Sequence, residues 1–164
     1  MSRQVLRSQV FRQRPSLDAW VGLLRSSSAV TRALNAELVA EHALTINDYE
    51  VLLHLAREPE RRLRRVDLAE RLVLTASGIT RLLDGLERAG YVTKAQCTSD
   101  ARVTYAVLTD DGLEKLRGAS ETHVAGIREL FESRFSDGEL QTLAGLLARL
   151  PAGSADGETC APSD

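Results

Sequence analysis

Residues 75–92 read T-A-S-G-I-T-R-L-L-D-G-L-E-R-A-G-Y-V, and this stretch predicts a helix that ends in a turn. Thr75 has the side chain of an N-cap, and Gly90 is the residue type that ends helices in a left-handed turn. Between them the apolar side chains recur at the spacing of one buried helix face: Ile79, Leu82, Leu83 and Leu86. The opposite face carries small polar residues and one arginine, so this face is expected to lie outside the core.

The periodicity changes after Gly90 from that of helices to that of strands. Residues 91–96 (Y-V-T-K-A-Q) and 102–109 (R-V-T-Y-A-V-L-T) are β-branched and aromatic segments of strand length. The C-T-S-D-A segment between them indicates a hairpin.

Two helices precede this stretch. Thr45 can cap a helix whose apolar positions end before Pro59, and residues 66–72 predict a compact helix. The E-R-R-L-R-R segment at 60–65 is expected to be a short basic connection. The order helix, short helix, helix, hairpin across residues 46–109 is that of a winged helix-turn-helix.

Amphipathic helices flank this unit on both sides. Ser16 can cap the first of them, Thr109 the next, and Ser136 with Glu139 forms a capping box before the last. We therefore predict a mainly α fold with a small β-hairpin wing. Its parts are a flexible basic arm (1–14), an N-terminal helix (15–45), the winged helix-turn-helix (46–109), C-terminal helices (110–150) and a disordered tail (151–164).

The formal net charge of the 164 residues is −2, which by itself argues against a nucleic-acid partner. The distribution of charge argues otherwise, because residues 57–102 carry ten basic and seven acidic side chains while residues 103–164 carry five and eleven. A basic middle next to an acidic end is more informative than the total.

Several classes of protein are excluded by what the sequence lacks. No apolar stretch approaches the length of a membrane span, and the N-terminus lacks the apolar core of a secretory signal, so a cytoplasmic protein is expected. Cys97 and Cys160 make no disulfide framework. The three histidines do not fall at metal-ligand spacing, and nucleotide-loop and nucleophile-elbow motifs are absent. We expect no cofactor, no metal and no catalysis.

The polar face of residues 75–89 suits contact with double-stranded DNA. Small hydroxyl residues and glycine near the first turn allow close approach, the free N–H groups there favour phosphate, and a long arginine can reach a base edge or the backbone. The residues concerned are Thr75, Ser77, Gly78, Thr80 and Arg81. A basic cluster precedes the helix-turn-helix and consists of Arg61, Arg62, Arg64 and Arg65. One or two of these arginines are expected to contact phosphates, and Arg64 and Arg65 are the candidates. An ordinary solvated helix face and a solvated basic loop are the competing interpretations.

Four segments together resemble the MarR family of bacterial transcription regulators: L-T-I-N-D-Y-E-V-L-L-H-L (44–55), V-D-L-A-E-R-L (66–72), residues 75–92, and S-D-A-R-V-T-Y-A-V-L-T-D-D-G (99–112). The resemblance covers roughly residues 20–150. It implies a homodimer in which the terminal helices form the interface. It also implies a regulator, usually a repressor, that releases DNA when a small aromatic or phenolic molecule binds.

The resemblance also assigns roles to single residues. Residues 75–89 look like the recognition helix for the major groove, and Arg102 looks like the wing arginine of the minor groove, with Asp100 as the acid that orients it. The family usually has a second arginine between these two, where this chain has Ala101. That departure lowers the wing affinity we expect.

The terminal helices carry apolar stripes that call for a partner, and in a dimer like the family's they would bury against a second copy. The family's effector pocket lies between those helices and the DNA-binding lobe. The aromatic and polar residues with suitable reach are Trp20, Ser28, Tyr49, Glu50, His54 and Arg57. A small aromatic or anionic effector is expected: Glu50, Arg57 and Arg81 resemble in placement the residues of a urate-responsive branch, and a phenolic carboxylate is the other option. Core packing or solvent exposure is the alternative fate of each residue.

Two other functions are compatible with the sequence. A winged-helix module that binds protein rather than DNA would keep the fold without needing Arg81 or Arg102. A thiol-based redox sensor would use Cys97 at the hairpin, although an incidental thiol is the simpler interpretation.

Overall fold

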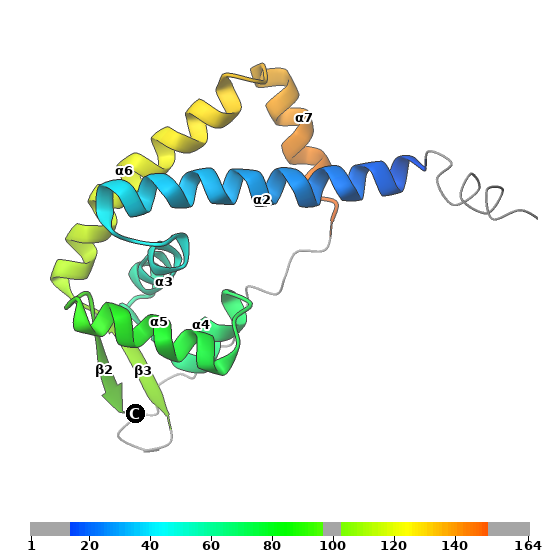
Figure 1. The fold of residues 1–164 in the computed structure, drawn as a ribbon. Helices are drawn as coiled ribbons and strands as arrows, with labels where there is room; N and C mark the ends of the chain where they lie inside the picture. The colour runs from blue at the N-terminus through cyan, green and yellow to red at the C-terminus, as the bar shows by residue number, and fades with distance from the viewer. Residues whose placement is uncertain (1–13, 97–102, 151–164) are drawn as a thin grey trace, which may run out of the picture.

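The computed structural model describes residues 14–96 and 103–150. Within these ranges lie six α-helices and three β-strands (Figure 1). The helices are α2 (Pro15–His42), α3 (Ile46–Arg57), α4 (Arg65–Arg71), α5 (Ala76–Arg88), α6 (Asp110–Glu132) and α7 (Asp137–Leu147), and the strands are β1 (Arg62–Arg64), β2 (Val92–Gln96) and β3 (Thr104–Leu108). The predicted mainly helical winged helix-turn-helix is confirmed.

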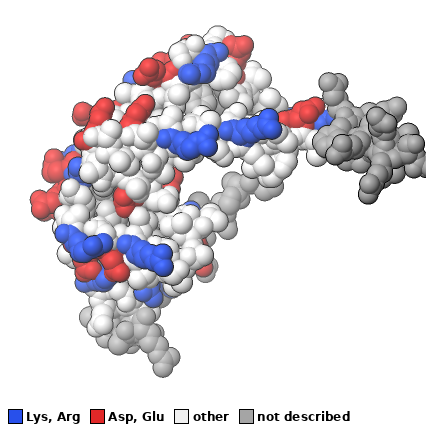
Figure 2. Space-filling model, viewed as in Figure 1, with Lys and Arg blue, Asp and Glu red and all other residues white. Residues whose placement is uncertain are grey.

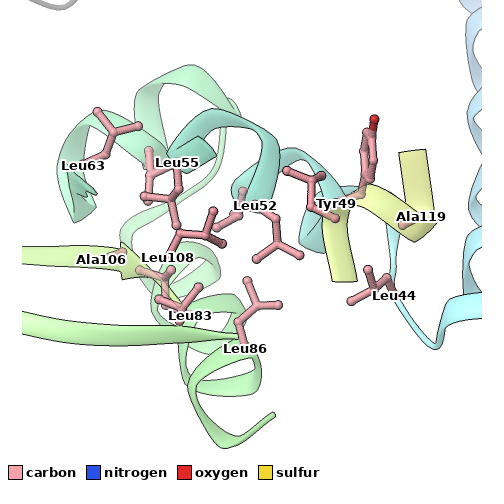
Figure 3. Packing of buried hydrophobic residues seen from close by; sticks show 14 of the residues in the cluster. Leu44, Tyr49, Leu52, Leu55, Leu63, Leu83, Leu86, Ala106, Leu108 and Ala119 are labelled. Carbon is pink, nitrogen blue, oxygen red and sulfur yellow. The ribbon is translucent and has the colours of Figure 1, made fainter. Parts of the chain in front are cut away.

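The core lies in the lobe formed by α3, α4, α5 and the sheet. Leucines of α3 and α5 meet Leu63 of β1 and the inward side chains of β3, as Figure 3 shows. The largest fully buried side chains of the lobe include Leu52, Leu55, Leu68, Ile79 and Leu86. Leucine and valine fill this interior with few aromatic rings, as the composition requires.

The sheet has three strands, not the two that were predicted. Its order is β1-β3-β2 with both pairings antiparallel, and Leu63 lies opposite Ala106 while Arg64 lies opposite Tyr105. The expectation that residues 60–65 are only a connection was therefore wrong. Leu63 is 5% exposed between two arginines of intermediate or greater exposure, which is the alternation of a strand, but three residues are too few to show that period in a sequence.

Most of the predicted helix caps are present. The Thr45 hydroxyl accepts a bond from the Asp48 N–H, and the Asp48 carboxylate accepts one from the Thr45 N–H at 2.8 Å, which completes a capping box. Ser136 and Glu139 form the second box. The prediction for Ser16 was wrong: α2 begins at Pro15, with Arg14 as an N-cap that makes no side-chain bond. Proline suits the first helical position because its missing N–H has no partner there anyway.

The long helices α2 and α6 contact each other above the lobe, and α7 folds back towards α2 (Figure 1). Only Leu34 and Leu38, in the second half of α2, are buried. Gly126 of α6 lies against the Glu37 carboxylate, where a Cβ atom would overlap it. The first half of α2 and the whole of α7 contain no buried residue.

The turn between α4 and α5 is a Schellman motif that has valine where glycine is usual. Leu74 N–H donates to the Ala69 carbonyl at 2.8 Å and Val73 N–H to the Glu70 carbonyl at 3.1 Å. Val73 consequently has φ +52°, in the left-handed region. For a non-glycine residue that conformation costs about 1–2 kcal/mol, so this turn holds backbone strain.

The start of α6 is joined to the end of α5 through backbone groups. The Thr109 hydroxyl donates to the Gly90 carbonyl at 2.7 Å and accepts from the Gly112 N–H at 3.0 Å. The Thr109 N–H donates to the Tyr91 carbonyl at 3.1 Å. Gly112 lies so close to this carbonyl that a Cβ atom would overlap it. The L-T-D-D-G sequence at 108–112 is thus explained by a helix cap and by a close backbone approach.

Substitution of Gly112 by alanine should lower the free energy of unfolding by on the order of 2–3 kcal/mol, because the added methyl group pushes against rigid backbone. Urea or thermal unfolding measures this loss. The matched control is Gly85→Ala in α5, where an added Cβ meets nothing within 4 Å. This control should be neutral or stabilising by up to about 1 kcal/mol. If Gly112→Ala and Gly85→Ala were equally stable, the approach of Gly112 to the Tyr91 carbonyl would not require glycine at this position.

Candidate nucleic-acid interface

Helix α5 presents one polar face and buries the other. Ile79, Leu83 and Leu86 are buried, whereas Ser77 and Arg81 are exposed. The helix begins at an N-cap, since the Gly78 N–H donates to the Thr75 hydroxyl at 3.1 Å. The polar face of residues 75–89 therefore lies at the surface through Thr75, Ser77 and Arg81, with Thr80 half-buried.

The hydroxyl groups near the start of α5 bond one another and the helix backbone. Thr75 Oγ1 lies 3.2 Å from Ser77 Oγ, and the Thr80 hydroxyl donates to the Ala76 carbonyl at 2.7 Å. Whichever way the Thr75–Ser77 bond runs, each hydroxyl keeps at least one unused donor or acceptor position, and Thr75 and Ser77 are exposed. Gly78 is half-buried, and a Cβ atom there would lie 3.2 Å from Thr75 Oγ1, so glycine keeps this cap uncrowded.

The basic cluster before the helix-turn-helix is mostly engaged within the chain. Arg61 pairs with Asp110 at 2.9 Å, and Arg62 pairs with Glu60 and lies over the Tyr105 ring at 5.1 Å. Arg64 binds both oxygens of Asp67, at 2.7 and 2.8 Å.

Arg65 differs from the other three arginines in its surroundings. It is exposed at the start of α4, and its charge contributes to lowering the pKa of Asp84. Of the two arginines selected for phosphate contact, Arg65 is therefore the more available and Arg64 supports the start of α4.

Lys94 of β2 ties the sheet to α5. Its Nζ lies 2.8 Å from Asp84 Oδ1 and 2.6 Å from Glu87 Oε2. The hydrogen bond with Asp84, followed by the one with Glu87, raises the pKa of Lys94, and the same bond with Lys94 lowers the pKa of Asp84. Sequence reasoning did not select this residue, because a strand residue and a helix residue ten positions apart share no period.

A hollow of about 160 Å³ lies between α4, α5 and the strands β2 and β3. Arg65 and Thr80, two of the predicted DNA-contacting residues, line it together with Lys94, Asp84 and Tyr105. Figure 2 shows basic and acidic side chains mixed over α5, basic ones over α2 and acidic ones along α6. The surface over α5 is thus less uniformly positive than the excess of basic over acidic residues in 57–102 suggests.

The remaining wing residues lie outside the described residues. These are Asp100, Ala101 and Arg102, as well as Cys97, the candidate redox thiol. The predicted basic arm, except for Arg14, and the predicted tail with Cys160 lie outside as well.

The effector candidates do not gather at one place in the single chain. Trp20, 56% exposed, and Ser28, also exposed, lie on the part of α2 that projects away from α3 (Figure 1). Glu50, His54 and Arg57 share one face of α3. Tyr49 belongs to the core: it is 6% exposed, its ring lies 4.6 Å from the His123 ring, and its hydroxyl lies 3.3 Å from Ser120 Oγ.

Glu50 and His54 on that face of α3 have shifted pKa values. Burial raises the pKa of Glu50. Burial, and then the charges of Arg71 and Arg57, lower the pKa of His54. Arg71, which sequence reasoning missed, pairs with Glu58 at 2.8 Å with only 16% and 15% of the two side chains exposed, and its Nε has no hydrogen-bond partner. A polar, partly desolvated surface therefore continues from α3 to α4.

A helix-turn-helix made of α4 and α5, with a three-stranded wing beside it and an exposed arginine on the second helix, defines a winged-helix DNA-binding protein. A model of the MarR family matches residues 42–103. The solved structure of AbsC, a MarR family regulator of Streptomyces coelicolor, is 31% identical with a TM-score of 0.74, and the match covers 84% of this chain and 92% of AbsC. The chain belongs to the MarR family of transcriptional regulators, which bind DNA, and it is not an enzyme.

Two further solved structures bear on function. Sco3205 of Streptomyces coelicolor, a MarR family regulator solved in complex with DNA, is 28% identical with a TM-score of 0.72, over 79% of this chain and 81% of Sco3205. CouR of Rhodococcus jostii RHA1, solved bound to p-coumaroyl-CoA, is 25% identical with a TM-score of 0.68, over 82% of this chain and 92% of CouR. Membership of a DNA-binding family disfavours the alternative of a module that binds only protein.

No helix among the described residues is long and apolar enough to cross a membrane. Across residues 14–96 and 103–150, no three histidine, cysteine or acidic side chains are grouped as a metal site would need.

Folding should become less stable as the pH falls from about 7.5 to 5.5, around the ordinary histidine pKa of about 6.5. Burial lowers the pKa of both His54 and His123, so in this range the unfolded chain binds more protons than the folded one. His123→Phe keeps a ring against Tyr49 but binds no proton, and it should reduce the pH dependence measured by urea unfolding. Adding His54→Gln should reduce it further.

The raised pKa of Glu50 acts in the opposite sense at lower pH, which is why the comparison stops at about 5.5. An unchanged slope in His123→Phe would contradict the assignment of the pH dependence to this half-buried ring.

Proposed function

We propose that this protein is a cytoplasmic homodimeric repressor that binds a pseudo-palindromic operator and releases it when a small aromatic, phenolic or urate-like molecule binds. The observation that carries the proposal is the exposed polar face of α5 beside the wing, in a chain of a DNA-binding family. A dimer bound across a promoter excludes the transcription machinery, which is the simplest way for such a regulator to act.

The unpartnered apolar surface supports a homodimer. Large apolar side chains are exposed along the first half of α2, along α6 and α7 and just after each of these two helices: Leu17, Trp20, Val21, Leu24, Val124, Ile127, Phe135, Leu146, Leu147 and Leu150. A second copy placed on the same elements by a twofold axis would cover them. Two copies of α5 would then face half-sites about one helical turn, roughly 34 Å, apart on the duplex.

Within each half-site the proposed contacts are of two kinds. Arg64, Arg65 and the start of α5 would hold phosphates, which supplies affinity without sequence information. The base edges would be read from the major groove by Arg81, with Thr75, Ser77, Gly78 and Thr80 allowing close approach. Arg102, positioned by Asp100, would enter the minor groove.

Removing phosphate contacts should flatten the salt dependence of operator binding. In a dimer, Arg65→Ala removes two contacts, so the slope of log Kd against log salt concentration should fall by about 1.8, whereas a monomer would lose about 0.9. Fluorescence anisotropy with an operator selected by the wild-type protein, between about 50 and 200 mM salt, measures the slope. Arg81→Ala should in addition reduce the preference for operator over random duplex.

The matched control for this experiment is Arg117→Ala. Arg117 is an exposed arginine of α6 that pairs with Glu114 and belongs to none of the proposed contacts. It should leave both slope and preference unchanged. A slope insensitive to Arg65 would remove that residue from the interface, and a wild-type slope near zero would overturn the proposed mode of binding.

The proposed effector site lies between α3 and the terminal helices of the dimer. The face of Glu50, His54 and Arg57 is polar and partly desolvated, and Trp20 offers an exposed ring that a second copy could bring near it. Tyr49 lies beside this face and Ser28 on α2. Arg57 suits an anionic effector, and the p-coumaroyl-CoA bound to CouR supports an aromatic one.

A screen of urate, salicylate, p-coumarate and p-coumaroyl-CoA should identify a compound that stabilises the dimer and releases the operator. At 100 times its Kd the compound should add about 2.7 kcal/mol to the free energy of unfolding. Arg57→Ala and Glu50→Gln should weaken this stabilisation, while Arg117→Ala should not. If none of the four compounds changes stability or operator binding, the effector class proposed here is wrong.

A further inference from the structure

Val73 is an apolar residue that is strained and almost wholly exposed at the turn of the helix-turn-helix. Its side chain is 91% exposed, the largest value among the exposed large apolar residues of the described chain. It has φ +52° at the position where the Schellman motif favours glycine. A β-branched side chain is the least suited to this conformation.

Nothing in the described chain explains why valine stands there. The two hydrogen bonds that close the turn come from the backbone N–H groups of Val73 and Leu74, so any residue with this backbone could make them. The side chain is outside the hydrophobic cluster, which takes in its neighbours Leu72 and Leu74 instead. Glycine would keep the turn and remove the strain.

The position of Val73 suggests what it contacts. It lies two residues before Thr75, the N-cap of α5, and is thus continuous with the surface that reads DNA. The apolar group that duplex DNA offers in the major groove is the C5-methyl of thymine. We propose that Val73 is a specificity-determining residue that packs on a thymine methyl at the edge of each half-site, an inference that rests on the proposed contacts of α5.

The test measures DNA binding by Val73→Gly, Val73→Ala and the control Ala43→Gly. The DNA is the operator selected by the wild-type protein, and copies of it in which single thymines are replaced by deoxyuridine. Val73→Gly and Val73→Ala should each weaken operator binding about fifteenfold, the loss expected for one buried methyl group in each of the two protomers. The wild-type protein should lose a similar factor at one deoxyuridine position in each half-site. The two variants should be insensitive to that replacement.

Thermal unfolding distinguishes the loss of the DNA contact from the relief of backbone strain at residue 73. Val73→Gly should raise Tm by a few degrees because the left-handed conformation no longer costs free energy. Ala43→Gly is the matched control: Ala43 has φ +52° at the end of α2, away from the helix-turn-helix, so this variant should raise Tm and keep wild-type operator affinity. Val73→Ala keeps a Cβ atom in the strained conformation, so its loss of affinity should come with a smaller rise in Tm.

Wild-type affinity in both Val73 variants would overturn the proposal. So would an operator on which no deoxyuridine replacement affects the wild-type protein, or on which the variants remain as sensitive as the wild type. A wild-type protein that selects no duplex at all would instead overturn the proposed operator binding, and this contact with it, so the two failures are distinguishable.

Discussion

The close approach of the first turn of α6 to the backbone of Gly90 and Tyr91 is the constraint on which the arrangement of the molecule depends. Thr109 bonds both residues through its hydroxyl and its N–H, and Gly112 leaves room for the Tyr91 carbonyl. Because Tyr91 N–H also donates to the Leu86 carbonyl, the end of α5 and the start of α6 share one rigid junction. The direction of α6 is thereby set relative to α5.

The net charge of −2 conceals how the basic residues are used. Arg61, Arg62 and Arg64 form ion pairs within the lobe, and Lys94 is held between two acids of α5. Exposed pairs of this kind contribute little stability each, but they fix where positive charge remains available. Arg65 is exposed and belongs to none of these ion pairs, and on α5 Arg81 and Arg88 are both exposed.

The terminal helices leave most of their apolar side chains exposed in the single chain. Their stripes predict burial, yet α7 contains no buried residue and α2 buries only two. A single chain lacks the surface to cover both long helices, because α6 contacts only the C-terminal part of α2 while the first half of α2 projects beyond the lobe (Figure 1). The effector candidates differ in the same way: Tyr49 is buried in the core, whereas Trp20 is exposed on the first half of α2.

Local signals in the sequence were sufficient for the helices, for four of the five caps they indicated and for the polar face of α5, since periodicity and capping act within a few residues of the chain. They were insufficient for β1, in which Leu63 pairs with Ala106 across the sheet, and for the ion pairs that Arg64 and Lys94 form with acidic side chains. They also gave no sign of the strain at Val73, which depends on how α4 ends. Pairings between distant residues carry no period, so only the packed chain decides them.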